Sequence, residues 1–467
     1  MLLVCNYFCN FAHIFNIIKK KVMKHLRWII PLIVTVILVA NSSCSPNHEL
    51  FDQEVTQAIS DSLSPVDSLD LHHNWMLTDT RSITVKANAD VNAQWLKILT
   101  ADPRKEPNAE VATQVMIADG ESAFLSFCYP KTVTTLYAAL VDDEGRFTVT
   151  EFTPSDTKVD FSEPLYTKQL MTYIPQPQTF VYCYEEEMPD YTNLDFDYND
   201  VVMGISYERT GEREMRFHVT LGAVGTNHPM SAALHLKNFK YDEIDTIYTE
   251  GGASFNVNSQ GKEIQEQVIS PNLLRTKEVL LKSQSQEKEE DKEAVINLFC
   301  DAHWATGDLL KPNEQYVINH WYYNVSKTSS QDMTYRTIVP REVTFVVTFK
   351  EAKGLEYLNF DLIDPFIIKE YLGGTFEVHQ FAYRNDWVLK EYRIAEEIVK
   401  LPWALVIPYK KFRHPLEGVN IGFKKKGAMG FGAYSSVRSH TFGEWSMDHN
   451  LAHDWYLNEY ATENQVY

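Results

Sequence analysis

The stretch Glu214-Met215-Arg216-Phe217-His218-Val219-Thr220-Leu221 alternates apolar and polar side chains along its length. A period of two residues indicates a β-strand with one buried face and one wet face. The same pattern returns far along the chain, in residues 343–349 (VTFVVTF). Strands of this kind are typical of antiparallel sheets, so the two stretches predict an all-β fold.

An upstream region shows the same strand pattern together with a hairpin. The apolar run Leu136–Val141 is followed by Asp142-Asp143-Glu144-Gly145 and then by alternation over residues 147–150. Two strands joined by a short turn that ends in glycine form a β-hairpin. Regular βαβ alternation and long helical heptads are absent from the sequence. We therefore predict two β-sandwich-like, mainly antiparallel domains with a few short helices, at residues 71–165 and 175–460.

One segment of the second domain departs from the strand pattern. Residues 282–293 (KSQSQEKEEDKE) are charged and of low complexity. A segment of this composition buries too little apolar surface to order itself, so we predict a disordered surface loop there.

The sequence Asn193-Leu194-Asp195-Phe196-Asp197-Tyr198-Asn199-Asp200 carries the strongest signal for a site. Its oxygen-bearing side chains alternate with two aromatic ones, so Asp195, Asp197 and Asn199 converge on one side of an extended or turning segment. Carboxylates this close repel one another unless a cation lies between them, and Ca²⁺ takes only oxygen ligands. The motif therefore predicts a calcium site, with Ca²⁺ as the cofactor.

Two other interpretations of this motif stay open. Counted from Asp195, the segment lacks the glycine and the glutamate of an EF-hand loop. A second acidic cluster, Glu185-Glu186-Glu187 with Asp190, lies just upstream and could fold back on it. The first alternative is a solvated turn capped by hydrogen bonds to its own backbone. The second is a catalytic pair of carboxylates.

The first 43 residues are typical of a secretory leader. Lys24 and Arg27 precede the apolar core Trp28–Ala40, which is too short to span a membrane, and Ser42-Ser43-Cys44 follows. A cysteine directly after small residues predicts a bacterial lipoprotein signal. Cys44 would then be the lipidated first residue of the mature chain.

The start of the chain leaves two points open. Residues 1–22 are typical of an upstream extension, with Met23 as the preferred start, and a signal anchor that is never cut is the alternative to a cleaved leader. Residues 44–70 are poor in large apolar groups and predict a flexible stalk. Several acyl chains on one cysteine attach a protein stably, so we predict lipid anchoring to the outer membrane, on its cell-surface or periplasmic face.

The net charge argues against two kinds of binding partner, and the cysteine content argues against a disulfide framework. Residues 1–43 hold five basic residues and no acidic ones, so the net charge of −20 for the whole chain becomes −25 for the remainder. A body this acidic argues against nucleic acid and against docking on anionic lipid headgroups. The remaining cysteines, Cys128, Cys183 and Cys300, are too scattered for a disulfide framework and predict buried thiols.

Several short blocks, in the same order, resemble the LruC-type outer-membrane lipoproteins of Bacteroidetes. The blocks are Tyr184-Glu185-Glu186, residues 195–202 (DFDYNDVV), Asp364-Pro365-Phe366-Ile367, Glu377-Val378-His379, Leu401-Pro402-Trp403-Ala404-Leu405, residues 412–418 (FRHPLEG), Phe442-Gly443-Glu444-Trp445 and Asp454-Trp455-Tyr456. The resemblance covers residues 175–460 and implies an exported, membrane-anchored β protein. The region from His73 to Phe161 is similar to the β domain that often precedes it.

The resemblance also implies a set of calcium ligands, carried over by position. These are Glu185, Glu186, Asp195, Asp197, Asn199 and Asp200. Two positions depart from the family pattern. Glu186 stands where the family has aspartate, and Asp364 stands where it has asparagine, which adds a charge.

A weaker alternative metal site is the pair His449 and His453. On a helix, two histidines four residues apart share a face, which suits Zn²⁺. The general-base glutamate of the H-E-x-x-H motif and a third ligand at a recognisable spacing are missing, so structural histidines are favoured. G-x-S-x-G and P-loop motifs are also absent, and the sequence predicts a protein that is not an enzyme.

These observations favour an exported, lipid-anchored, non-enzymatic module that binds a carbohydrate or a surface protein. A structural or adhesin subunit that assembles through an edge strand is the first alternative. A glycoside hydrolase that uses an Asp/Glu pair is the second.

Overall fold

The computed structural model of the chain describes a set of segments that all belong to one compact unit, Ser60–Tyr467. They are residues 66, 69–70, 72–88, 91–161, 169–170, 174–186, 195–250, 288–299, 301–306, 322–327, 335–371, 374–381, 383–385, 401–422 and 432–467. The predicted leader, Cys44, Cys300 and nearly all of the stalk lie outside the described residues. In the described part of the chain, no helix is long and apolar enough to cross a membrane.

The upstream region folds as two sheets with a shared core. In spatial order, the smaller sheet contains β4 (Ser122–Pro130), β1 (Thr78–Lys86) and β7 (Lys158–Asp160). The larger sheet contains β8 (Gln169–Leu170), β6 (Arg146–Phe152), β5 (Leu136–Asp142), β2 (Ala93–Leu99), β3 (Glu110–Met116) and β9 (Gln176–Pro177). The side chains between the sheets include Ile83 of β1, Leu96 of β2 and Phe127 of β4, which are all fully buried.

The predicted hairpin forms in this region. β5 and β6 pair antiparallel, with Leu136 opposite Phe152 and Val141 opposite Phe147. Gly145 closes the turn with a φ of +75°, a left-handed conformation that glycine adopts without steric cost. Local turn chemistry therefore determines this strand pair, as the sequence indicates.

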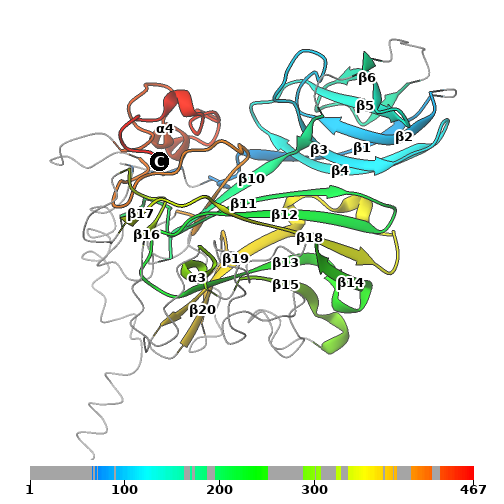
Figure 1. Ribbon diagram of the computed structural model, residues 1–467. Coiled ribbons are helices and arrows are strands. Elements are labelled where there is room, and N and C mark those ends of the chain that lie inside the picture. The colour runs from blue at the N-terminus through cyan, green and yellow to red at the C-terminus, as the bar shows by residue number, and fades with distance from the viewer. Residues whose placement is uncertain are drawn as a thin grey trace, which may run out of the picture. The chain divides into compact units, whose positions relative to one another are not determined.

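The second region is built on two further sheets (Figure 1). One contains, in spatial order, β14 (Ile244–Thr249), β18 (Arg341–Phe349), β12 (Glu214–Ala223), β11 (Val201–Arg209), β10 (Thr179–Tyr184) and β22 (Ala404–Ile407). The other contains β15 (Glu293–Phe299), β13 (Met230–Lys240), β19 (Ile363–Tyr371), β20 (Gly374–Val378) and β21 (Tyr383–Asn385). A parallel pair, β16 (Tyr322–Tyr323) and β17 (Tyr335–Arg336), stands beside them.

The alternating stretches form central strands of the first of these sheets. In β12, Met215, Phe217, Val219 and Leu221 are buried, whereas the polar residues between them are partly exposed. β18 pairs with β12 in antiparallel register, with Phe345 opposite Phe217. The rings of these two residues stack 5.2 Å apart. The period of two therefore predicts both the strands and their buried face correctly.

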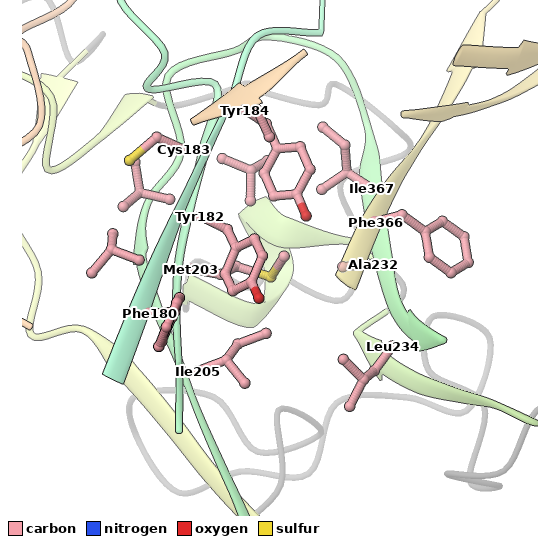
Figure 2. Packing of buried hydrophobic residues seen from close by; sticks show 14 of the residues in the cluster. Phe180, Tyr182, Cys183, Tyr184, Met203, Ile205, Ala232, Leu234, Phe366 and Ile367 are labelled. Carbon is pink, nitrogen blue, oxygen red and sulfur yellow. The ribbon is translucent and has the colours of Figure 1, made fainter. Parts of the chain in front are cut away.

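The core of the second region lies between its two sheets. Figure 2 shows the side chains that meet there: Phe180, Tyr182 and Tyr184 of β10, Met203 and Ile205 of β11, Ala232 and Leu234 of β13, and Ile367 of β19. The Tyr184 hydroxyl crosses the core and donates to the Pro365 carbonyl at 2.5 Å. This hydrogen bond pairs one buried hydroxyl of the core with the opposite sheet.

Helices are short and few among the described residues, as predicted for an all-β protein. The α-helices are α3 (Ala302–Thr306) and α4 (Phe442–Met447). Thr441 caps α4 by accepting a hydrogen bond from the Glu444 amide at 3.1 Å. Single 3₁₀ turns are η1 (Tyr241–Glu243), η4 (Glu289–Asp291), η5 (Leu355–Tyr357), η6 (Phe360–Leu362) and η8 (Asn458–Tyr460).

The predicted disordered loop at 282–293 needs a correction at its C-terminal end. Residues 289–291 form η4, and β15 begins at Glu293. Lys240 Nζ contacts Asp291 Oδ1 at 3.0 Å, and the Asn238 amide donates to Glu293 Oε1 at 2.6 Å. Contacts with Asn238 and Lys240 of β13 therefore hold the C-terminal end of this segment in place. Residues 282–287 lie outside the described part of the chain.

Candidate metal centre

The two acidic segments lie at the same end of one strand pair. Glu185 directly follows β10, and Asp200 directly precedes β11. These strands pair antiparallel, with Tyr184 opposite Val201, so the residues just beyond them are neighbours in space. The Glu185 amide donates to the Trp403 carbonyl at 2.9 Å, which continues the backbone hydrogen bonding of β10 by one residue.

Three of the predicted ligands come together at this point. Glu185, Asp195 and Asp197 each offer a carboxylate oxygen, and these atoms lie within 4.8 Å of one another. Glu185 is 1% exposed and Asp197 is 2% exposed, while Asp195 is partly buried. The predicted turn is therefore buried rather than solvated.

The backbone of the motif is bent at both aromatic residues. Phe196 and Tyr198 have φ angles of +55° and +53°, a left-handed conformation that costs a bulky residue about 1–2 kcal/mol. Both rings are completely buried, and the Tyr198 hydroxyl donates to the Pro402 carbonyl at 2.9 Å. The Ile421 amide donates to the Phe196 carbonyl at 2.9 Å. Packing and these hydrogen bonds hold the strained loop in place.

Asp197 also caps the loop backbone. Its carboxylate accepts from the Asn199 amide at 3.1 Å and from the Gly418 amide at 2.8 Å. Gly418 has a φ of +68°, which presents its amide to Asp197. The backbone-capped turn and the carboxylate cluster are therefore features of the same loop.

The electrostatics of the cluster favour the binding of a cation or of protons. Burial, followed by the charge of Asp200, raises the pKa of Glu185 well above its usual range. Burial also raises the pKa of Asp197 strongly, with Asp195 and Glu417 adding to it, and the pKa of Asp195 is raised by burial as well. Buried carboxylates that stay anionic need a cation or protons near them.

Glu186 does not belong to the convergent group, which corrects its assignment as a ligand. Its Oε1 accepts from the Thr226 hydroxyl and contacts His228 Nδ1, both at 2.6 Å, while its Oε2 is ion-paired with Lys369. Burial works to raise the pKa of Glu186, but the His228 hydrogen bond and the Lys369 charge outweigh it and the pKa is lowered. Glu186 is thus already neutralised by the protein.

Asn199 and Asp200 mainly support the loop. Asp200 Oδ2 accepts from the Glu186 amide at 2.5 Å, and Asn199 Nδ2 donates to the Pro415 carbonyl at 3.2 Å. Asn199 Oδ1 and Glu185 Oε2 are buried and have no hydrogen-bond partner among the described residues. A Cβ at position 225 would overlap the Asn199 side-chain oxygen, so only glycine fits there.

Sequence reasoning missed the residues that surround the cluster. They are Glu417, Gly418, Gly225, Lys369 and His228. Glu417 and Gly418 do end a block that resembles the LruC-type family, which was an available signal. The other three come from β19 and the segment after β12, and nothing in their local sequence marks them.

The alternative pair of histidines does not share a helical face. α4 ends at Met447, so His449 and His453 follow the helix in turns. His453 Nε2 contacts the His449 carbonyl at 2.6 Å, and the His449 ring is hydrogen-bonded to Asp70. His449 forms a partly exposed group with Asp70 and Asp448 that does not include His453. The expectation of paired ligands on a helix is therefore wrong.

The buried thiols of the described residues are poorly suited to catalysis. Cys128 and Cys183 are both free and buried. Burial, with a contribution from Asp361, raises the pKa of Cys128 to about 12, and burial also raises the pKa of Cys183. A protonated buried thiol is a weak nucleophile.

The donor set fits a hard cation. Glu185, Asp195 and Asp197 offer only oxygen atoms, they are close together, and one of the buried oxygens lacks a partner. Ca²⁺ binds carboxylates and carbonyl oxygens in flexible geometries, whereas zinc sites use cysteine and histidine.

Comparison with known proteins gives a match to a family model over part of the chain. Residues 213–425 match a family model described as a domain of unknown function, DUF4842. The search of curated proteins gives no match. A crystal structure described as a candidate lipoprotein from Bacteroides ovatus is similar, with 15% identity and a TM-score of 0.44 over 79% of this chain and 99% of that chain. The LruC-type assignment, made from motifs, stays a prediction.

Proposed function

We propose that this protein is an exported, lipid-anchored binding module whose second domain is stabilised by Ca²⁺. The observation that carries the calcium assignment is the convergence of Glu185, Asp195 and Asp197 in a buried group. These three carboxylates would hold the ion, with Asn199 and Asp200 supporting the loop. Bound Ca²⁺ would supply the positive charge that offsets their mutual repulsion.

The geometry supports an ion site over a glycosidase pair. Three carboxylates converge here, each with an oxygen within 4.8 Å of the others, whereas a glycosidase works with one pair. Glu185 and Asp197 are also too deeply buried to reach a sugar chain. We therefore propose that the protein is not an enzyme and binds a carbohydrate or a surface protein.

The lipid anchor rests on the leader. A charged start, an apolar core and Ser42-Ser43-Cys44 support cleavage before Cys44 and acylation of its thiol. Acylation would hold the acidic body on the outer membrane without a spanning segment.

The calcium proposal is tested by thermal melting of the full-length protein in EDTA and in millimolar Ca²⁺. Ca²⁺ should raise the Tm of the wild type because it binds the folded state only. Asp197→Ala should lose most of this rise. Asp245→Ala, which removes an exposed carboxylate on β14, should keep it.

A direct measurement of Ca²⁺ binding distinguishes the loss of a calcium ligand from a variant that fails to fold. Titration calorimetry should give one tight Ca²⁺ site in the wild type and a weakened site in Asp195→Asn, a milder change. A wild type that neither binds Ca²⁺ nor gains Tm would overturn the calcium assignment.

The anchor is tested by metabolic labelling with palmitate and by membrane fractionation. The wild type and a Ser43→Ala control should incorporate label and sediment with the outer membrane, whereas Cys44→Ser should be unlabelled and soluble. Full sedimentation of an unlabelled Cys44→Ser protein would contradict anchoring through this residue.

A further inference from the structure

A cavity of about 390 Å³ lies at one edge of the second domain, apart from the acidic cluster. Its walls come from both sheets of the domain and from residues 76–78, at the start of β1 in the upstream domain. β10 contributes Phe180 and Tyr182, and β19 contributes Asp364. The volume lies within the range of about 300–1,000 Å³ that is typical of small-molecule sites.

Aromatic rings form a large part of the cavity wall. Phe180 stacks on Phe360, with ring centroids 3.6 Å apart, and both line the cavity. Phe381 also lines it and is 41% exposed. A ligand that entered past Phe381 would meet ring faces that are already fixed by packing.

Two lining residues offer hydrogen-bonding groups that the protein does not use. Gln380 is held by its backbone, because its carbonyl accepts from the Trp403 amide at 2.9 Å. Its side-chain Nε2 is buried and has no partner within the described residues. Tyr182 directs its hydroxyl away from its own strand (Figure 2), and no described residue is hydrogen-bonded to it. An unpaired donor in a cavity costs free energy that a polar ligand can recover.

Carboxylates complete the polar lining. Asp364 is fixed by His379, whose Nδ1 lies 3.0 Å from Asp364 Oδ2, and Lys237 Nζ lies 4.0 Å from the same oxygen. Asp361 lines the cavity as well and is exposed. Among the described residues of the lining, the basic groups of His379 and Lys237 both lie near the Asp364 carboxylate, and Asp361 adds a second negative charge.

The combination of groups selects one class of ligand. An anion would be repelled by the carboxylates of Asp361 and Asp364, and an apolar molecule would leave Gln380 Nε2 and the Tyr182 hydroxyl unpaired. A neutral polyhydroxylated ring can donate to carboxylates, accept from an amide and place its C–H face on an aromatic ring. Such a ring would therefore contact the carboxylates, the amide and the aromatic rings of the cavity wall.

We propose that this cavity is a binding site for a neutral saccharide, about the size of one or two sugar rings. Phe381 would stack on the sugar, while Gln380 and the two aspartates would bind its hydroxyl groups. The inference rests on the binding role proposed above but not on the calcium ion. It also places the ligand away from Glu185 and Asp197.

The test is titration of the full-length protein, purified in detergent, against short neutral oligosaccharides of hexoses and pentoses, with uronic-acid oligosaccharides alongside. The wild type should bind at least one neutral oligosaccharide. Phe381→Ala and Gln380→Ala should each weaken that binding by about tenfold, the effect of losing one stacking or hydrogen-bonding contact. Tyr248→Ala, which removes an equally exposed ring on β14 outside the cavity, should bind like the wild type.

Each other outcome gives a distinct answer. Saccharide binding that both cavity variants retain would overturn this site but leave the binding role intact. Binding of uronic-acid oligosaccharides alone, or of none of the panel by a wild type with an unchanged Tm, would overturn the neutral-saccharide assignment. Equal Tm values for all variants would show that lost binding is not lost folding.

Discussion

At the scale of single residues, the contrast between Glu185 and Glu186 explains the site. They are adjacent in sequence and both buried, yet the pKa of Glu185 is raised and that of Glu186 is lowered. Burial by itself raises the pKa of both side chains. Other carboxylates surround Glu185, whereas Lys369 and His228 contact Glu186. Glu185 is therefore the one that benefits from an added cation.

Lys369→Met should destabilise the domain by about 3–5 kcal/mol, because it leaves Glu186 as a buried unpaired charge. Urea unfolding measures the change. Lys240→Met is the matched control, since its ion pair with Asp291 is on the surface and should contribute far less to stability. Adding Glu186→Gln to Lys369→Met should restore part of the loss; equal effects of the two lysine changes would contradict a buried pair.

Gly225→Ala should cost at least about 2 kcal/mol, because its Cβ would overlap the Asn199 side chain inside the loop. The Gly225 amide also holds the loop by donating to the Asp200 carbonyl at 3.0 Å. Chemical denaturation compares it with Gly204→Ala on β11, where the added Cβ meets only ordinary contacts at 3.5 Å and 3.7 Å. A smaller cost for Gly225→Ala than for Gly204→Ala would argue against this packing.

At the scale of elements, the pairing of β10 with β11 creates the carboxylate cluster. The strands bring Glu185 beside the 195–200 loop, and the left-handed turns at Phe196 and Tyr198 direct both aromatic rings into the core. Two short strands and their connection therefore concentrate negative charge at one strand end.

The stability of this element should depend on pH in opposite ways with and without Ca²⁺. Glu185, Asp195 and Asp197 have pKa values raised by burial, so in EDTA the folded state binds more protons than the unfolded state. Stability should then fall as the pH rises above the ordinary carboxyl range of about 4. Protonated carboxyls do not bind Ca²⁺, so the Tm gain from Ca²⁺ should grow over the same range.

Melting curves from pH 4.5 to 8, in EDTA and in Ca²⁺, measure both effects at pH values above the ordinary carboxyl pKa. Asp197→Asn removes one of the titrating groups and should flatten the EDTA profile. A Tm gain from Ca²⁺ that is constant with pH would contradict ligation by these carboxyls.

At the scale of the whole molecule, the β domains have separate hydrophobic cores. One core contains Ile83, Leu96 and Phe127, and the other contains the residues around Phe180, Met203 and Leu234. The proposed ion site and the proposed saccharide cavity both belong to the second core.

Ca²⁺ should therefore protect the two domains unequally from hydrogen exchange. Amides of β10 and β11 should exchange more slowly with Ca²⁺ than in EDTA, because local opening there would release the ion. Amides of β2 and β5 should be unaffected and act as an internal control. Equal protection in both domains would place the effect of Ca²⁺ elsewhere.

The sequence alone determined the β class, the main strands and the β5–β6 hairpin. These features depend on alternation and turn chemistry within a few residues, as in β12 and around Gly145. The sequence also marked Glu185, Asp195 and Asp197 as candidate ligands, because their side-chain chemistry is visible without a fold.

The tertiary structure alone decided what each of these residues contacts. It removed Glu186 from the group by pairing it with Lys369, and it ended α4 before His449 and His453. It also assembled the cavity from β10, β19 and the segment after β20. The physical reason is that burial and charge pairing depend on strands far apart in the chain, which local patterns do not encode.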